Sequence, residues 1–354
     1  MIPAYDIAII GLGPAGATAA RLLDKKFKII ALDKKSAARG SFKKPCGGLL
    51  APDAQKALSK FNLALPKEVL VDPQIFAVKT IDAGQSLSRY YQRFYINLDR
   101  HKFDMWLISL IPRGVEVKSG AICTGIEKRG DSYEIAYTQD KAEHKISAGL
   151  VIGADGANSI VRKTLFPERK LSQYAAIQQW FAEEEQAPFY SCIFDGGLTD
   201  SYCWGVSKDG YFILGGAFAK KQSRQKFELL KKKLQEQGFN FGEPVKTEAC
   251  LISMPRGPRD FCLGKERAFL LGEAAGFISP TSLEGISYAL NSANDLACVL
   301  NSGCGGPMRK FRRKSAPMRV KLLFKYVKAP FMYNAFLRKL VMKSGINSIN
   351  VIKE

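Results

Sequence analysis

The chain of 354 residues is long enough to bury one large core or two intertwined domains, and its apolar fraction of 46% is ordinary for a globular protein. Eight scattered cysteines without CxxC spacing, and only His101 and His144 beside them, argue against a zinc or histidine-based metal site. The formal net charge of +20 is the unusual feature of the composition.

Three features of the sequence favour a cytoplasmic location. No uninterrupted apolar run reaches the ~18 residues of a membrane-spanning helix. The first expected strand starts almost at the N-terminus and leaves no room for a cleaved signal peptide. Unpaired cysteines are the ordinary state of thiols in the cytosol.

A glycine-rich turn follows a strand expected at residues 5–10 and precedes a helix. Its sequence is GLGPAG, at residues 11–16. Gly11 permits a tight turn, Gly13 lets the backbone approach a pyrophosphate, and Gly16 allows the helix to pack closely on the strand. The N–H groups that open the helix would face the phosphates. The pattern therefore predicts a dinucleotide-binding turn.

The next expected strand, at residues 27–32, ends at Asp33, whose carboxylate can accept a hydrogen bond from a ribose hydroxyl. A loop rich in lysine, serine and glycine follows as far as Gly48, and residues 98–111 have a helical pattern. Arg100 in that helix could reach the phosphates of a nucleotide, and a role as an ordinary surface arginine stays open.

A second glycine segment, GADG at residues 153–156, ends a buried strand. Because parallel strands of doubly wound sheets end at the crevice where cofactors bind, Asp155 is expected near that crevice. Residues 165–261 then consist of short aromatic and β-branched runs separated by turns, which predicts a meander of antiparallel strands over a substrate pocket. A charged helix is expected within it at residues 223–237.

The third segment, GEAAG at residues 272–276, follows a further expected strand. Its small residues leave space for a ribityl chain, and Glu273 could accept hydrogen bonds from ribitol hydroxyls. Gly285 and Ile286 begin a helix whose N-terminal N–H groups could stabilise negative charge on a reduced flavin ring. Together the three segments predict FAD bound by parts of the chain that are distant in sequence.

The C-terminal part of the chain is strongly basic. No acidic residue lies from Leu296 to Lys353, whereas arginine and lysine crowd residues 309–343 and apolar side chains recur there at helical spacing. A basic amphipathic helix of this kind is typical of a surface for anionic lipid headgroups. A solvated helix packed on the core and a nucleic-acid patch are the alternatives. Because the rest of the chain has no nucleic-acid-binding motif, no nucleic-acid partner is expected.

The motifs taken together resemble those of the geranylgeranyl reductase family, within the flavoproteins that share the para-hydroxybenzoate hydroxylase fold. The resemblance covers residues 4–300 at least. It rests on GLGPAG, KPCGGLL at residues 44–50, Arg100 with Asp104, GADGANSIVR and GEAAGFISPTSLEGISYAL. The PCGG element is typical of the reductases rather than of the aromatic hydroxylases.

The resemblance implies an α/β fold class: a Rossmann-like FAD-binding domain of the GR2/PHBH type, an inserted antiparallel-sheet substrate domain and a basic helical C-terminus. Residues 1–75, 96–165 and 262–305 would form the FAD-binding domain, residues 76–95 and 166–261 the substrate domain, and residues 306–354 the C-terminal segment.

The resemblance also implies the residues of the site. The cofactor-binding set is Gly11, Gly13, Pro14, Ala15, Gly16, Asp33, Lys34, Pro45, Cys46, Gly47, Gly48, Arg100, Asp155, Gly156, Gly272, Glu273, Gly276, Gly285 and Ile286. Cys46 would lie near the flavin ring, and Tyr202 with Trp204 matches the start of the YxWxFP element that lines the lipid pocket of the reductases. Two positions depart from the family pattern: Glu273 replaces an aspartate, and residues 205–207 lack the Phe and Pro of that element.

No serine–histidine pair, carboxylate dyad or metal cluster offers itself as a catalyst, as expected when a cofactor carries the chemistry. The leading hypothesis is FAD-dependent reduction of double bonds in an isoprenoid or other lipid-like, polyprenyl substrate. Hydride would come from N5 of the reduced flavin, and the proton from Cys46, a nearby tyrosine or water. The alternatives are an aromatic-type FAD monooxygenase and a flavin- or lipid-binding regulator without turnover.

The electron donor and the assembly state are less constrained. No second dinucleotide-binding motif is visible, so the donor is open between NAD(P)H, a ferredoxin and a quinol. A monomer is expected by default, peripheral on the inner face of the cell membrane through residues 309–343.

Overall fold

The computed structural model describes residues 2–36, 38, 41–183, 188–303 and 305–352, and the chain divides into two compact units. The first unit contains Met1–Lys43, His101–Ser172 and Ser253–Phe324, and the second contains Lys44–Arg100, Gln173–Ile252 and Lys325–Glu354. The sequence places residues 44–75 with the FAD-binding domain, whereas the structure groups them with the second unit. The C-terminal segment from residue 306 onward is shared between the two units.

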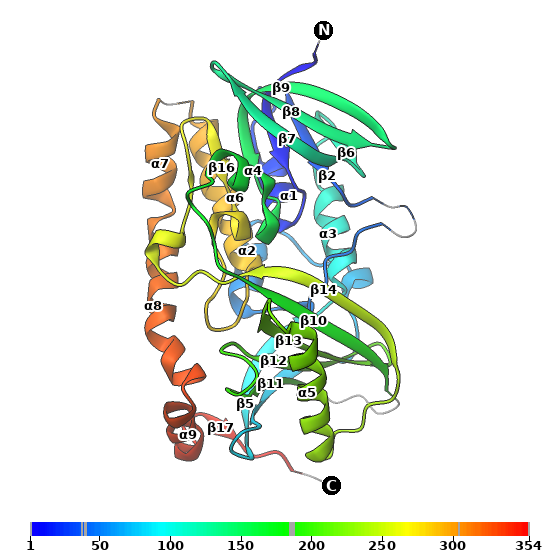
Figure 1. The fold of residues 1–354 in the computed structure, drawn as a ribbon. Coiled ribbons are helices and arrows are strands. Elements are labelled where there is room, and N and C mark those ends of the chain that lie inside the picture. Colours follow the sequence, from blue (N-terminus) through cyan, green and yellow to red (C-terminus); the bar gives the residue numbers. More distant parts are fainter. Residues whose placement is uncertain (1, 37, 39–40, 184–187, 304, 353–354) are drawn as a thin grey trace. The chain divides into compact units, whose positions relative to one another are not determined.

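The first unit is built on an eight-stranded sheet with a parallel centre (Figure 1). In sheet order its strands are β15 (Gly264–Lys265), β16 (Ala268–Leu270), β9 (Ala142–Gly153), β1 (Ala4–Ile10), β2 (Ile29–Asp33) and β6 (Val115–Ser119), with β8 (Ser132–Gln139) and β7 (Ile122–Arg129) attached to β9. All neighbours from β16 to β6 are parallel, which confirms the Rossmann-like arrangement. The end of β1, between β9 and β2, is the position where doubly wound sheets bind cofactors.

The helices of the first unit pack small residues closely together. They are α1 (Pro14–Leu22), α3 (Arg100–Ser109), α4 (Ile160–Leu165), α6 (Ile286–Asn301), α7 (Pro307–Lys314) and the first part of α8 (Ala316–Tyr333), with 3₁₀ turns η2 (Gly156–Asn158), η3 (Pro258–Asp260) and η4 (Gly272–Ala275). α1 and α6 lie side by side. Ala17, Ala19 and Ala20 of α1 are buried, and their small side chains allow this close contact.

The strand β2 begins later than predicted. The N–H of Phe27 donates to the carbonyl oxygen of Asp24 at 3.1 Å and so belongs to a turn. Pairing of β2 with β1 starts only at Ile29, opposite Ile7.

The second unit is built on a nine-stranded sheet. In sheet order its strands are β14 (Pro244–Ser253), β10 (Gln173–Ala182), β13 (Tyr211–Ala219), β12 (Cys203–Lys208), β11 (Phe189–Phe194), β4 (Ile75–Asp82), β5 (Leu87–Asn97) and β17 (Ser348–Ile349), with β3 (Leu49–Leu50) paired to β5. β10, β13, β12 and β11 are successive antiparallel neighbours, as the sequence predicts. The next neighbour of β11 is β4, which comes from an earlier part of the chain and pairs with β11 in parallel. β4 itself forms an antiparallel hairpin with β5.

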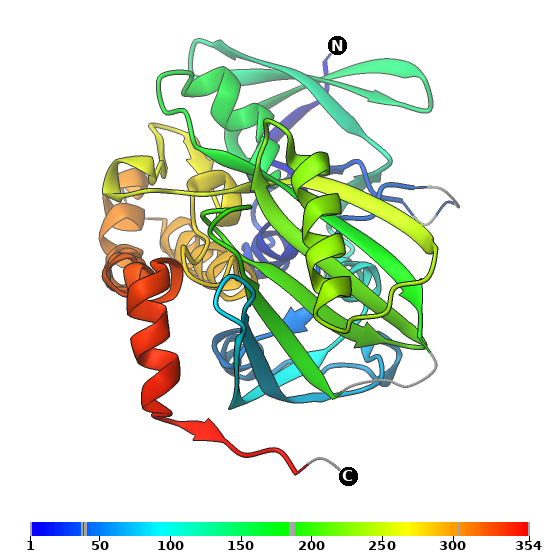
Figure 2. The same cartoon turned by 60° about the horizontal axis from the view of Figure 1, so that its bottom comes forward.

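α5 (Ser223–Glu236) lies across one face of this sheet (Figure 2). It buries Phe227, Leu230 and Leu234, which recur every three or four residues and form the apolar stripe of a charged helix. Burial of one such side chain contributes about 1.5–3 kcal/mol, so the stripe suffices to dock the helix. The remaining helices of the unit are α2 (Pro52–Lys60), the 3₁₀ turn η1 (Lys67–Val69) and α9 (Ala335–Ser344).

The predicted helical C-terminus is confirmed as α7, α8 and α9. Arg338 lies in the segment that the sequence predicts as a basic surface, but its side chain is buried, with 4% of it exposed. In the part of the chain that the structure describes, no helix is both long and apolar enough to cross a bilayer.

Candidate functional site

The turn between β1 and α1 has the geometry that its glycines predict. Gly11 has a φ of +93°, and a Cβ there would lie 2.7 Å from the carbonyl oxygen of Ala154. A Cβ on Gly16 would lie 1.8 Å from the carbonyl oxygen of Gly11. Around Gly13, by contrast, the described residues beyond its chain neighbours leave the Cβ position clear to 4 Å. The turn is closed at two glycines and open at the third, as the approach of a pyrophosphate requires.

The start of α1 is suited to an anion. Gly13 is the N-cap and provides no side-chain hydrogen bond, and Pro14 takes the first helical position, where its missing N–H costs nothing. The N–H groups and positive dipole end of a helix so capped attract phosphate. Ala15 is buried and packs against η4, since a Cβ on Gly272 would lie 3.2 Å from that of Ala15.

Asp33 stabilises the turn from the end of β2. Its carboxylate accepts hydrogen bonds from the N–H of Leu12 and, at 2.6 Å, from the N–H of Lys35. The Lys35 ammonium lies 3.2 Å from Asp104 Oδ2 and 3.6 Å from Asp33 Oδ2, and all three side chains are buried. A carboxylate can accept about four hydrogen bonds, so the predicted contact of Asp33 with a ribose remains compatible with this network.

Lys34 and Lys35 have opposite surroundings. The Lys34 side chain is exposed, and its ammonium lies 3.5 Å from the centre of the Phe42 ring. The sequence predicts Lys34 as a cofactor ligand, but the lysine that lies among the residues of the turn is Lys35. Because successive side chains at a strand end point to opposite sides, the choice between adjacent lysines cannot be read from composition.

Asp155 carries a buried oxygen that lacks a partner. Its Oδ2 accepts the N–H groups of Ile160 at 2.6 Å and Val161 at 3.3 Å, whereas Oδ1 has no hydrogen-bond partner among the described residues. Burial raises the pKa of the carboxyl. The site adjoins the GLGPAG turn, since a Cβ on Gly11 would lie 2.8 Å from the Asp155 Cα. Gly156 follows with a φ of +75° and begins η2.

The unpaired oxygen is a test of the predicted cofactor. A buried acceptor without a donor costs about 1–3 kcal/mol, and native proteins rarely leave one. A sugar or ribityl hydroxyl would donate to it and remove that cost. The residues around Asp155 and Gly13 therefore fit a dinucleotide cofactor.

Arg162 positions the third glycine segment. Its guanidinium donates to the carbonyl oxygens of Ala274 at 3.0 Å, Asp260 at 2.8 Å and Arg169 at 2.7 Å. The side chain is buried, and the sequence motif that contains it gave no role for it. Gly276, which ends η4 with a φ of +85°, completes the turn that Arg162 holds.

The Glu273 carboxylate accepts a hydrogen bond from the protein backbone. Its Oε1 accepts the N–H of Ser253 at 2.8 Å, at the end of β14. The additional methylene relative to aspartate gives the carboxylate this reach. The Ser253 hydroxyl is itself buried and has no hydrogen-bond partner in the described residues. The contact of Glu273 with ribitol stays a prediction.

The start of α6 carries a carboxylate of its own. Gly285 is the N-cap and Ile286 the first helical residue, as predicted. Glu284 accepts the N–H and the hydroxyl of Ser287 at 2.9 and 3.0 Å. A carboxylate at a helix N-terminus offsets the positive end of the dipole, which weakens any stabilisation of a reduced flavin there.

In the second unit the PCGG loop and Arg100 lie together. The Cys46 Sγ accepts the N–H of Gly48 at 3.4 Å and lies 3.6 Å from the Arg100 Nη1. Gly48 has a φ of +64°, and a Cβ there would lie 2.3 Å from the Leu98 carbonyl oxygen. Lys208, which the sequence did not single out, is buried and donates to the carbonyl oxygens of Leu98 at 2.7 Å and Gly48 at 3.3 Å. Burial lowers the pKa of Lys208 to about 8.

Pro45 and Gly47, the other residues of the PCGG loop, differ in how closely they are packed. The Pro45 carbonyl oxygen accepts from Cys250 Sγ at 3.7 Å, which ties the loop to β14. The described residues beyond its neighbours leave a Cβ position on Gly47 clear to 4 Å. Substitution of Gly47 is therefore sterically permitted, whereas substitution of Gly48 is not.

The environment of Cys46 favours the thiolate. Burial raises the pKa of the thiol, but the charge of Arg100, the Gly48 N–H and Lys44 outweigh burial and lower the pKa below its ordinary value. A thiol in such surroundings is more reactive at neutral pH than an ordinary cysteine.

At about pH 6.5 an alkylating reagent should modify Cys46 faster than Cys123 or Cys192, because burial raises the pKa of each of those thiols to about 12. Arg100→Met should slow the modification of Cys46 several-fold, and Arg93→Met on the exposed face of β5 should leave it unchanged. Mass spectrometry of the alkylated peptides measures these rates. The difference in the Cys46 rate between the wild type and Arg100→Met should become small near pH 10. Equal rates in these two proteins at pH 6.5 would contradict the role of Arg100.

Tyr202 and Trp204 lie mainly inside the second unit, at 6% and 8% exposure. The hydroxyl of Tyr202 accepts from that of Tyr190 at 3.3 Å, and burial raises the pKa of Tyr202 well above its usual value. The Trp204 indole lies over Gly215 of β13, where a Cβ would come within 2.3 Å of the ring. Its Nε1–H is buried without a partner in the described residues, so it has hydrogen-bonding capacity left for a ligand.

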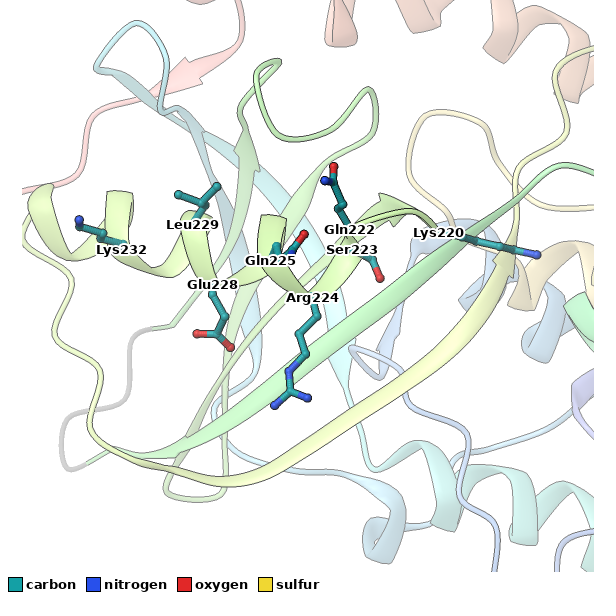
Figure 3. Close-up of a pocket in the computed structure, with 8 residues that line it drawn as sticks. All are labelled: Lys220, Gln222, Ser223, Arg224, Gln225, Glu228, Leu229 and Lys232. Atoms are coloured by element: carbon teal, nitrogen blue, oxygen red, sulfur yellow. The ribbon is translucent and has the colours of Figure 1, made fainter.

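A shallow hollow of about 860 Å³ lies at α5 and the residues just before it (Figure 3). It is lined by Lys220, Gln222, Ser223, Arg224, Gln225, Glu228, Leu229 and Lys232. None of the predicted site residues lines it, and its charged side chains of both signs suit solvent rather than a lipid-like substrate.

Solved flavoenzymes share the fold over nearly the whole chain. A geranylgeranyl bacteriochlorophyll reductase-like protein from Thermoplasma acidophilum matches with a TM-score of 0.71 at 18% identity, over 99% of this chain and 89% of that one. The p-nitrophenol 4-monooxygenase PnpA from Pseudomonas putida matches with a TM-score of 0.70 at 14% identity, over 99% and 100% of the two chains. The fold is therefore that of the flavin-dependent oxidoreductases and monooxygenases. No protein-family model matches the chain.

Curated relatives define the family more narrowly. Protein CbrA from Escherichia coli O6:H1 is 49% identical over 351 residues, which cover 99% of this chain and 96% of the relative. Protein CbrA from Escherichia coli K12 is 48% identical over 351 residues and 99% of both chains. The chain therefore belongs to the CbrA family. The predicted resemblance to geranylgeranyl reductase-like proteins is confirmed by the shared fold.

Proposed function

We propose that this chain is an FAD-dependent oxidoreductase that reduces double bonds of an isoprenoid or other lipid-like substrate. The observation that carries the proposal is the combination, in the first unit, of a turn open only at Gly13 with the unpaired buried oxygen of Asp155. An anion-binding helix start and a hydroxyl acceptor are what a dinucleotide cofactor needs.

Within the proposal the residues have separate tasks. The turn at Gly13 and the start of α1 would bind the pyrophosphate, and Asp33 and Asp155 would accept hydrogen bonds from hydroxyl groups of the sugar and ribityl parts. Bound FAD would supply hydride from N5 to the substrate double bond. Arg100 would lower the pKa of the Cys46 thiol and so make it a better proton donor than an ordinary cysteine, and the PCGG loop would present it.

The lipid-like substrate is supported by the aromatic character of the second unit. Trp204 has an unpaired indole N–H suited to one polar group of a substrate, and Tyr202 remains protonated across the physiological range. The Thermoplasma acidophilum structure is described as geranylgeranyl bacteriochlorophyll reductase-like, which supports the same substrate class.

The purified protein should be yellow, and heat denaturation should release FAD in about equimolar amount. Its visible spectrum and the identification of the released chromophore by chromatography and mass spectrometry check this result. Protein with reduced FAD, kept without oxygen, should then reduce about one double bond of a polyprenyl lipid per flavin, so that the lipid gains two hydrogen atoms as the flavin is reoxidised. A colourless protein that takes up no added FAD would refute the proposal.

An aromatic-type FAD monooxygenase is the second candidate, supported by the equally similar fold of the p-nitrophenol 4-monooxygenase. Such an activity would consume oxygen and NAD(P)H in proportion to a hydroxylated product. Bound FAD with neither reaction would favour a regulator without turnover.

A further inference from the structure

α8 presents a row of exposed apolar side chains. Val320, Phe324, Val327 and Phe331 are 48%, 65%, 69% and 51% exposed. Their spacing of four, three and four residues places them on one face of the helix. Leu322 is fully buried and shows that a different face of the helix packs on the protein.

Lysines follow this apolar row along α8. Lys321, Lys325 and Lys328 each come one residue after an exposed apolar residue. Because successive residues turn by about 100° around a helix, the lysines form a second row beside the apolar one. The arrangement is that of a helix lying in a membrane interface, where apolar side chains enter and lysines stay at the headgroups.

α9 repeats the arrangement within the second unit. Phe336 and Leu340 are 67% and 52% exposed, and Lys343 continues the same face one turn further on. Lys339 lies beside them at three residues from Phe336.

α9 is held in place by its opposite face. The buried Arg338 donates from Nε to Asp82 Oδ2 at 2.8 Å and from Nη1 to the Met332 carbonyl oxygen at 2.7 Å. Arg89 of β5 donates to the carbonyl oxygen of Met342 at 3.1 Å. The exposure of the Phe336 face is therefore fixed by packing on β4 and β5, beside β17 in Figure 1.

The charge of this region identifies what covers it. No acidic residue lies from Leu296 to Lys353, so every charged side chain that this stretch of the sequence places along the exposed apolar rows is a cation. We propose that the apolar and lysine rows of α8 and α9 dock the protein on an anionic lipid leaflet. The inference does not depend on the flavin or on the substrate.

Two other occupants fit the surface less well. A nucleic acid offers phosphates, but its outer surface provides no apolar phase for large exposed phenylalanines. A second copy of the chain would bring the same lysines together, and like charges repel. An anionic bilayer supplies both an apolar layer and negative charge.

The full-length protein should sediment with vesicles of phosphatidylglycerol mixed with phosphatidylcholine and remain in solution with vesicles of phosphatidylcholine alone. Binding should weaken in high salt, because ions screen the lysines. Equal binding to both vesicles, or to neither, would overturn the proposal.

Two sets of variants separate the charge from the apolar contribution. Lys328→Gln, Lys339→Gln and Lys343→Gln together should weaken partitioning about 100-fold, since each lysine near an anionic leaflet contributes about fivefold. Phe331→Ser with Phe336→Ser should weaken it at least about tenfold, because about half of each ring leaves water on docking.

Matched variants elsewhere in the second unit serve as controls. Lys60→Gln, Lys221→Gln and Lys232→Gln change the net charge equally on other exposed surfaces. Phe76→Ser with Phe94→Ser removes two aromatic rings that are 61% and 54% exposed. If either control weakens binding as much as its counterpart, the α8 and α9 rows are not the docking surface.

Measurements of mass and of DNA retention test the other occupants. Without lipid the protein should keep one mass over a wide range of concentration, and its binding to DNA should be weaker than to phosphatidylglycerol vesicles. A dimer that Phe331→Ser with Phe336→Ser dissolves, or retention on DNA that exceeds vesicle binding, would overturn the assignment.

Discussion

Gly13→Ala should leave the protein folded and weaken FAD binding about 10- to 100-fold. The backbone of Gly13 has φ −69° and ψ −171°, which alanine adopts without strain, and the described residues leave its Cβ position clear. The new methyl group would stand where the pyrophosphate approaches the turn. Overpacking of this kind costs about 1–3 kcal/mol, which corresponds to the expected loss of affinity.

Gly16→Ala provides the contrast. The new Cβ would lie 1.8 Å from the Gly11 carbonyl oxygen, so the backbone itself must move. Both the stability of the first unit and its affinity for FAD should therefore decrease. Gly114→Ala is the neutral control, because the described residues beyond its neighbours leave its Cβ position clear and it lies outside the turn.

Titration of apo-protein with FAD, followed by the change in flavin fluorescence, measures the affinities, and thermal unfolding of the apo-proteins measures stability. An unchanged affinity in Gly13→Ala would show that no phosphate approaches this backbone. An apo-protein of Gly13→Ala that unfolds like Gly16→Ala would show that the effect is structural.

The GLGPAG turn was predictable because each glycine has a local geometric reason. A positive φ at Gly11 and a backbone contact at Gly16 are consequences of the turn itself, so a short motif carries them. The parallel arrangement of the strands around β1 was also predictable, because alternating strands and helices favour parallel neighbours. Both the GLGPAG motif and the backbone geometry of its turn depend on residues that are close together in the sequence.

The buried charges could not be predicted in this way. Arg162 and Lys208 bond to carbonyl oxygens about a hundred residues away in the chain, and Lys35 pairs with Asp104 across 69 positions. No periodicity marks a lysine or arginine whose partner is a distant backbone group. Composition also misplaced Arg338, because a basic residue within a basic stretch is indistinguishable from its exposed neighbours until the partner, Asp82, is known.

The parallel pairing of β11 with β4 belongs to the same class of missed features. Aromatic and β-branched runs predict strands, and turns predict hairpins, but only the tertiary fold decides which earlier strand joins the edge of a meander. The register of this pair, with Phe189 opposite Ala77, connects segments more than a hundred residues apart.

Arg338→Met should lower the free energy of opening of α9 by about 3–5 kcal/mol. The substitution keeps the aliphatic part of the side chain but leaves Asp82, which is 1% exposed, without its cation. Gln85 Nε2, which donates to Asp82 Oδ2 at 3.1 Å, would remain as a neutral side-chain donor. Removal of one partner of a buried ion pair typically costs this much, because the other charge stays buried.

Amide hydrogen exchange of α9, β4 and β5, resolved by mass spectrometry, measures the local opening. Arg129→Met is a matched control, since its partner Glu127 is 60% exposed and exposed pairs contribute little.

The double variant Asp82→Asn with Arg338→Met decides between charge and packing. If the loss comes from the uncompensated carboxylate, the neutral amide at position 82 should restore at least about half of it. If the loss comes instead from the two carbonyl oxygens of Met332 and Tyr333 that Arg338 also binds, the double variant should open as easily as the single one. An unchanged exchange rate in Arg338→Met itself would mean that β17 and the remaining contacts of α9 suffice to hold this helix.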